Sequence, residues 1–157
     1  MNKYEILLDK AVENDLNVKE KVFKSNADGL IKGNTILINN SISLTAEKSC
    51  VLAEELGHYY TTVGNILDQS IDANRKQELK ARMWAYDRQI GLSGLIDACE
   101  NKCETLHDMA EYLEVTEEFL TETLEAYASK YGLSTKVGNY TVYFEPLRIS
   151  FEKDGEK

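Results

Sequence analysis

The chain has 157 residues, 43% of them hydrophobic and only one of them proline, so it is long enough to fold around a buried core. Its formal net charge of −9 excludes general affinity for nucleic acid or for anionic membranes, because such polyanions are repelled by most of the surface. No apolar run approaches the roughly 20 residues that span a bilayer. Three cysteines favour reduced thiols over a disulfide framework, so we expect a cytoplasmic protein.

Two elements are predicted before residue 40. Residues 2–14 place their apolar side chains at the spacing of a helix with one buried face. Residues 29–39, GLIKGNTILIN, contain two short apolar runs on either side of Lys32, Gly33 and Asn34. Gly and Asn tolerate the positive φ of tight turns, so this stretch predicts a β-hairpin.

The next predicted element is a helix over about residues 45–62 that carries the stretch CVLAEELGHYYTT. Zinc-protease helices carry the pattern H-E-x-x-H, in which two histidines one turn apart bind the metal and the glutamate acts as a base. Here Glu54 stands at the first histidine, while Glu55 and His58 keep the other two places. The motif therefore has a carboxylate where a zinc protease has an imidazole.

A second strong helix is predicted over about residues 75–90, RKQELKARMWAYDRQI, after a loop. Its periodicity predicts that Leu79, Met83, Trp84 and Ala85 face inward. Gly91 and the glycine that follows it three residues later break the pattern.

Two further helices are predicted between about residues 104 and 131, divided near Glu114 to Thr116, with Thr116 as an N-cap. The stretch STKVGNYTVYFEPL, residues 134–147, alternates around Gly138 and predicts a second hairpin that Pro146 ends. The fold class is therefore α+β. We expect a peptidase-like region over 1–100 and an acidic helical pair with a hairpin over 101–157, packed together as one compact unit.

The spacing of the motif is compatible with a metal centre. Residues four apart share a helix face, so Glu54 and His58 point the same way. Zinc accepts carboxylate oxygen as well as imidazole nitrogen, and a catalytic site needs three protein ligands. Glu55 is offset by about 100° around the helix, where a general base could lie. The best candidate for the third ligand is Glu78, with Asp68 and Asp72 as weaker alternatives.

Three other features have a functional and a plain interpretation, and the plain one is favoured for each. Cys50 lies one turn before Glu54 and is a possible soft ligand, but it is typical of a small core residue. Tyr59 and Tyr60 are possible oxyanion donors, although tyrosines at such positions mostly serve packing. His107 is expected to be solvated or to cap a helix.

A wider pattern joins these motifs. Besides EELGH, the second helix reads E-x-x-A-x-x-W-A from Glu78 to Ala85. With these motifs the chain resembles the ImmA/IrrE family of metallo-endopeptidases, encoded by phages and integrative elements, in a subgroup with EELGH in place of HELGH. The resemblance covers Gly29–Gln69, Arg75–Ala98, Met109–Gly132 and Asn139–Leu147.

The resemblance implies roles for individual residues. It implies that His58 and Glu78 are metal ligands, that Glu54 occupies the first ligand's place, and that Glu55 is the catalytic base. It also implies Zn²⁺ as the cofactor and cleavage of a transcriptional repressor as the function. Because two carboxylates and one imidazole are a harder ligand set than two imidazoles and one carboxylate, Mn²⁺ or another divalent ion is also possible. The alternative function is a non-catalytic antirepressor or adaptor of the same fold.

The segment HDMAEYLEVTEEFLTETL, from residue 107 onwards, has the spacing of a helix-turn-helix. However, the stretch from Glu104 to Ser129 contains eight acidic residues and no lysine or arginine. A recognition helix must approach phosphates, so we exclude DNA binding by this segment. An acidic face suits a basic partner, which agrees with a basic helix-turn-helix repressor as the substrate; the oligomeric state is not predicted.

Overall fold

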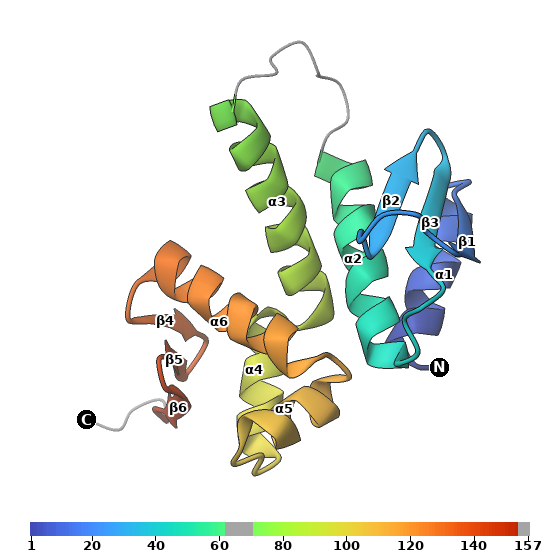
Figure 1. Ribbon diagram of the computed structural model, residues 1–157. Helices are drawn as coiled ribbons and strands as arrows, with labels where there is room; N and C mark the ends of the chain where they lie inside the picture. The colour runs from blue at the N-terminus through green and yellow to red at the C-terminus, as the bar shows by residue number, and fades with distance from the viewer. Residues whose placement is uncertain (62–70, 154–157) are drawn as a thin grey trace. The chain divides into compact units, whose positions relative to one another are not determined.

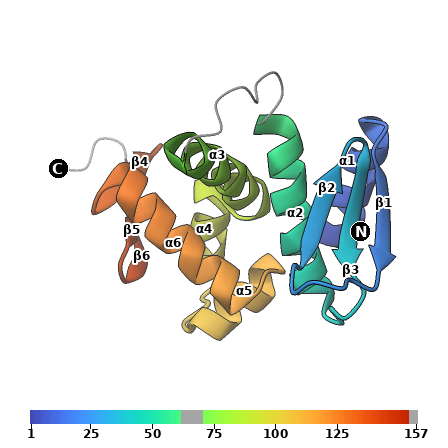
Figure 2. The ribbon, with the colours of Figure 1, turned by 45° about the horizontal axis from the view of Figure 1, so that its top comes forward.

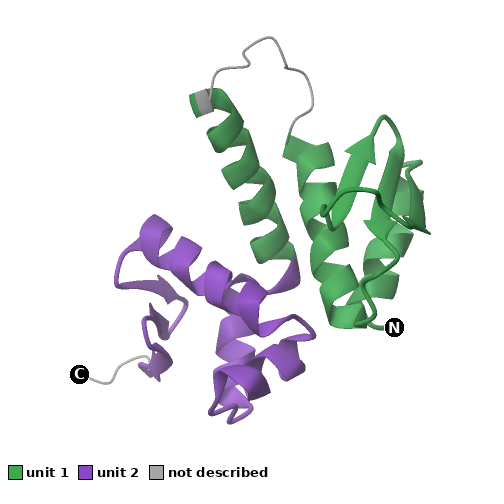
Figure 3. Cartoon of the chain, viewed as in Figure 1, with its two compact units in different colours: residues 1–88 green, residues 89–157 purple. Residues whose placement is uncertain are grey.

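The computed structural model describes residues 1–61 and 71–153, which form two compact units, residues 1–88 and residues 89–157 (Figure 3). The first unit contains α1 (Lys3–Glu13), β1 (Asn17–Lys21), β2 (Gly29–Lys32), β3 (Thr35–Asn39), α2 (Thr45–Thr61) and nearly all of α3 (Ile71–Gln89). The second contains α4 (Gly91–Glu100), α5 (Leu106–Leu113), α6 (Glu117–Tyr131), β4 (Ser134–Val137), β5 (Tyr140–Phe144) and β6 (Leu147–Phe151). The α+β class is confirmed. The packing of two regions into one unit stays a prediction.

The first unit is a three-stranded sheet packed on α2 (Figure 1). The strand order is β1-β3-β2, with β1 parallel and β2 antiparallel to β3. The predicted hairpin is confirmed as β2 and β3, and Gly33 in its turn has a φ of 62°. Ile36 and Ile38 of β3 are fully buried, together with Leu52 and Leu56 of α2. The alternating apolar side chains of β3 therefore form the sheet side of this core, and α2 forms the other side.

Strand β1 was missed because its sequence, NVKEK, lacks an apolar alternation. Only Val18 is partly buried, while the other four residues are exposed. The strand lies at the edge of the sheet and depends on backbone pairing with β3, from Asn17 opposite Thr35 to Lys21 opposite Asn39. Glu20 also forms an ion pair with Lys48 of α2.

In both views, α2 lies between the sheet and α3 (Figures 1 and 2). The backbones of the two helices approach closely at Gly57. A Cβ atom built on Gly57 would lie 2.2 Å from the carbonyl oxygen of Ala81. Ala81 and Ala85, on the same side of α3, are fully buried. Small residues at these positions therefore set the separation of α2 and α3.

One prediction for α3 was wrong. Leu79, expected to face inward, is 57% exposed. The buried side of α3 is instead set by Ala81, Ala85 and Tyr86. Leu79 is offset from this side by its position on the helix, because each residue advances about 100°.

The second unit joins α4, α5 and α6 to an antiparallel sheet of order β4-β5-β6. Thr116 caps α6 as predicted, with its hydroxyl accepting a bond from the amide of Phe119 at 3.0 Å. Val142 and Phe144 of β5 are buried. The ring of Tyr127 of α6 packs edge to face against the ring of Phe144, with the ring centroids 6.0 Å apart. The core of this unit therefore lies between the helices and one face of the sheet.

Two boundaries in the second unit differ from the prediction. Gly91, with a φ of 67°, is the first residue of α4, and Gly94 lies inside this helix, which was not predicted. Pro146 does not end the sheet. It lies in the turn between β5 and β6, and β6 extends the predicted hairpin to three strands.

The two units differ in charge. Residues 1–88 contain 12 basic and 13 acidic side chains, whereas residues 89–157 contain 6 and 14. Nearly all of the net negative charge therefore belongs to the second unit. None of the helices within residues 1–61 and 71–153 combines the length and the hydropathy that a bilayer span requires.

The packing at Gly57 gives a test of the fold. Gly57→Ala should lower the free energy of unfolding by about 1–3 kcal/mol or more, because the new methyl group overlaps a backbone carbonyl that has no free rotamer. The measurement is thermal unfolding by calorimetry. Gly94→Ala is the matched control, because its Cβ would lie 3.4 Å from Leu113, an ordinary contact, and alanine favours a helix interior. Equal stability of the two variants would contradict the packing at Gly57.

Candidate functional site

Helix α2 carries three of the four predicted site residues within about one turn. Glu54, Glu55 and His58 are all partly buried, whereas Leu52 and Leu56 on the same helix are completely buried. The apolar residues fix how the helix is rotated against the sheet. This rotation places the polar positions at the margin of the core, where they have restricted access to solvent.

Helix α3 brings the fourth residue to them. Nε2 of His58 lies 3.3 Å from Oε2 of Glu78. The other carboxylate oxygen, Oε1 of Glu78, lies 3.4 Å from Nε of Arg82, one turn further along α3. Glu78 lies one turn before Ala81, the residue against which Gly57 packs. The close approach of the helices therefore allows the His58–Glu78 contact.

The sheet approaches the same site through Gly29, the first residue of β2. A Cβ atom on Gly29 would lie 2.6 Å from Cγ1 of Val51 and 3.3 Å from Oε1 of Glu55. The absence of a side chain thus lets the backbone of β2 lie directly against the Glu55 side chain. Glu55 is enclosed by this strand on one side and shares its helix with Glu54 and His58.

These surroundings change the acidity of Glu55. Burial, followed by the negative charges of Glu54 and Glu78, raises its pKa from the ordinary value of 4.5 to about 7. Burial disfavours a charged carboxylate, and nearby carboxylates repel its charge. Three carboxyl groups and one imidazole thus interact within this part of the first unit. A carboxyl group that exchanges protons near pH 7 suits general acid–base chemistry.

The donor set fits a divalent cation in part. Imidazole nitrogen and carboxylate oxygen are both zinc ligands, and His58 and Glu78 are close enough to share one ion. Yet within residues 1–61 and 71–153 no three His, Cys, Asp or Glu side chains are arranged to hold a metal ion. The structure therefore brings two of the three proposed ligands together, and the role of Glu54 as the third stays a prediction.

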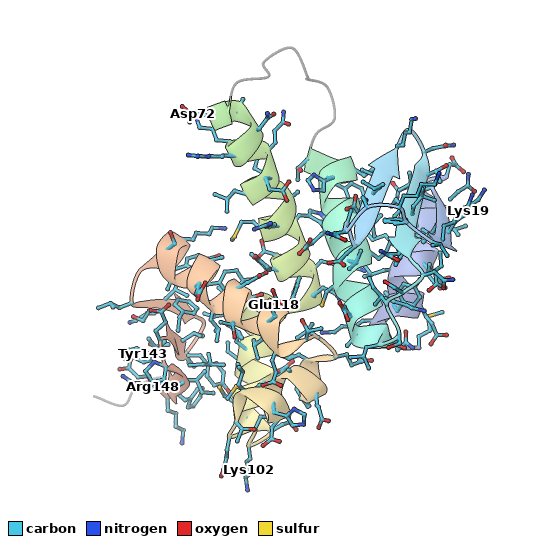
Figure 4. The ribbon with its side chains drawn as sticks, in the orientation of Figure 1. Lys19, Asp72, Lys102, Glu118, Tyr143 and Arg148 are labelled. Carbon is cyan, nitrogen blue, oxygen red and sulfur yellow. The ribbon has the colours of Figure 1, made fainter. Side chains whose placement is uncertain are left out.

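Of the weaker ligand candidates, the structure describes Cys50 and Asp72. Cys50 is only 6% exposed, as expected for a core residue. Asp72 is exposed in the first turn of α3 (Figure 4), and Asp68 lies outside the described residues. His107 is exposed and contacts Glu111 and Glu117 in the second unit.

Tyr60 serves mainly in packing. Its ring stacks on Trp84 with centroids 5.0 Å apart, Nζ of Lys10 lies 5.3 Å from its centroid, and its hydroxyl oxygen accepts a hydrogen bond from Asn14. A cavity of about 320 Å³ is lined by Lys10, Tyr60, Trp84, Asp87 and Arg88. Tyr60 therefore joins α1, α2 and α3, and the described residues that line this cavity do not include Glu54, His58 or Glu78.

Two glycines that shape the site, Gly57 and Gly29, are not among the predicted site residues. Gly57 interrupts a helical pattern and Gly29 begins a strand, and an isolated glycine in either place indicates a close backbone approach. This signal was present in the sequence. What it could not show was which neighbour approaches, since Ala81 is 24 positions from Gly57 and Glu55 is 26 positions from Gly29.

The raised pKa of Glu55 links stability to pH in metal-free protein. Protonation of Glu55 favours the folded state, so this stabilisation is complete below the unfolded pKa of 4.5 and is lost as the pH rises through about 7. Between about pH 5.5 and about pH 8 the free energy of unfolding should fall by an amount on the order of 2 kcal/mol because of Glu55. The Glu55→Gln protein should not show this fall. The free energy of unfolding of both proteins is measured at each pH by urea unfolding in the presence of a chelator. Identical pH dependence of the two would contradict the burial of Glu55.

Comparison with known families places the chain. Residues 10–125 match the IrrE N-terminal-like domain, which is peptidase family M78. The matched region includes every predicted site residue. Comparisons of the chain with curated proteins and with solved structures gave no match. The chain belongs to the M78 metallopeptidase family of IrrE N-terminal-like domains.

Proposed function

We propose that the chain is a metal-dependent, site-specific endopeptidase that cleaves a transcriptional repressor of a phage or mobile element. The observation that supports this most directly is the approach of His58 to Glu78, at 3.3 Å, beside the enclosed carboxyl group of Glu55. Family membership supports a protein substrate. The remaining details, including the repressor, come from the resemblance of the sequence and its charge.

Each residue has a role in this proposal. Glu54, His58 and Glu78 would hold a divalent ion, with Zn²⁺ first and Mn²⁺ as an alternative. Such an ion polarises the scissile carbonyl and makes water more acidic. Glu55 accepts the proton of the attacking water and then donates it to the leaving amine. Arg82, by its contact with Oε1, orients the carboxylate of Glu78 toward His58.

The carboxylate at position 54 has an electrostatic consequence. Two carboxylates formally cancel the charge of a divalent ion, whereas two imidazoles and one carboxylate leave one positive charge. A less positive centre acidifies water less effectively. The proposal therefore predicts an enzyme that binds zinc more weakly than a relative with histidine at this position, and that works best at a higher pH.

A substitution tests the ligand set. Glu54→His should tighten zinc binding by about tenfold, equivalent to about 1.4 kcal/mol, because it restores an imidazole one turn before His58. Calorimetric titration of zinc into both proteins gives the dissociation constants. Glu47→His, on the first turn of the same helix, controls for binding by any added imidazole. Unchanged or weaker affinity in the Glu54 variant would falsify the assignment of Glu54.

Co-expression tests catalysis. The chain is expressed with the repressor encoded beside it, and a discrete repressor fragment should accumulate. Glu55→Gln keeps the shape of the side chain but removes its basicity, so the fragment should decrease by at least about a hundredfold. Glu47→Gln is the matched control and should leave cleavage unchanged.

The same experiment separates the second candidate, a non-catalytic antirepressor. This candidate is favoured by the lack of an assembled three-ligand group among the described residues. If repression is released without a fragment, and the release persists in the Glu55→Gln protein, the chain acts by binding the repressor and the peptidase proposal fails.

A further inference from the structure

One face of α3 is exposed although it carries large apolar side chains. Leu79 is 57% exposed, and Met83, one turn later on the same side, is only partly buried. Ala81 and Ala85, by contrast, are fully buried on the side that faces α2. The apolar surface at Leu79 therefore takes no part in the contact between the two helices.

Three cations border this apolar surface. Arg75 lies one turn before Leu79, in line with Leu79 and Met83, while Lys76 and Lys80 form the neighbouring row one turn apart. All three are exposed, and within the described residues none of the three forms an ion pair. We call the surface formed by Arg75, Lys76, Leu79, Lys80 and Met83 the α3 basic face.

The α3 basic face lies beside the candidate catalytic residues. Glu78 directly precedes Leu79, and the two side chains are about 100° apart around the helix. Arg82, one turn after Glu78, is rotated from it by about 40° toward the side of Leu79 and is already paired with it at 3.4 Å. A peptide bound along the face would therefore pass next to the His58–Glu78 contact.

We propose that the α3 basic face is the docking surface for a protein segment that combines acidic and apolar side chains. The exposed Leu79 and the partly buried Met83 offer apolar contact, which the aliphatic stems of the lysines extend, while the three charged groups select carboxylates. The cations stand out in a chain whose net charge is −9. Asp72 and Asp87, exposed at the two ends of α3, limit the positive surface to a short segment and disfavour a continuous phosphate backbone.

This inference rests on the proposed function in one respect, because it makes the docked segment part of the protein substrate. The segment binds outside the reacting atoms, so recognition of a site-specific substrate does not depend on the scissile bond alone. Binding and cleavage can therefore be measured separately.

The test uses the full chain with Glu55→Gln, which prevents cleavage of bound peptides. A library of short random peptides is selected on the immobilised protein, and the enriched peptides are measured by fluorescence anisotropy. Enriched sequences should combine Asp or Glu with Leu, Met or Phe. The double variant Lys76→Glu/Lys80→Glu should weaken their binding by about tenfold or more, as should Leu79→Ser.

The matched control is Lys19→Glu/Lys32→Glu, which reverses two exposed lysines of the N-terminal sheet; Lys19 is labelled in Figure 4. It should leave peptide affinity unchanged. Circular dichroism confirms that each variant is folded. The proposal would be overturned if the selected peptides were not enriched in acidic residues, or if the Lys19→Glu/Lys32→Glu protein lost as much peptide affinity as the α3 variants. It would also be overturned if the protein bound a DNA oligonucleotide in place of acidic peptides. If acidic peptides bind as expected but no repressor is cleaved by the unmodified chain, docking stands and the proposed peptidase activity fails.

Discussion

The close approach of α2 and α3 at Gly57 is the constraint on which the candidate site depends. Glu78 reaches His58 only because no side chain separates the backbone at Gly57 from the carbonyl oxygen of Ala81. The polar residues of the site are thus positioned by a close backbone contact, which lies next to His58 on α2 and one turn from Glu78 on α3. Gly29 acts in the same way on the other side, where a strand lies directly against the side chain of Glu55. Two missing side chains therefore determine the dimensions of the site.

This compactness has an electrostatic cost, because it concentrates negative charge. Glu54 and Glu78 both raise the pKa of a glutamate that burial already disfavours as an anion. A proton on Glu55 relieves the repulsion, and a cation would relieve it more completely. The same geometry therefore makes the site responsive to pH and, under the proposed function, to divalent ions. Arg82 offsets part of the charge through Glu78, but it is half exposed and its contribution is correspondingly screened.

Periodicity allowed most of the fold to be predicted, and its failures have physical reasons. The β2–β3 hairpin and helices α1, α2, α3, α5 and α6 follow from apolar spacing and turn residues, whereas β1 depends on backbone pairing that its sequence does not show. Leu79 was misplaced because a leucine at helical spacing ordinarily faces a core. For the site, the spacing of Glu54 and His58 was sufficient to suggest a shared face, and the position of Glu78 on the next helix made it the best candidate for the third ligand, which the family resemblance also implies. The contacts of Gly29 and Gly57 connect positions far apart in sequence, so no local pattern could predict them.

The unequal division of charge between the two units matters before any partner makes contact. Residues 89–157 carry an excess of eight acidic side chains, while residues 1–88 are nearly neutral and present cations on α3. An electric field of this kind acts over roughly a Debye length, about 8 Å at physiological ionic strength. A protein with a basic domain and an acidic segment would therefore be turned during its approach, so that each part meets the surface of opposite sign. Such pre-orientation raises the rate of productive encounters without any gain in equilibrium affinity, and it weakens as salt is added.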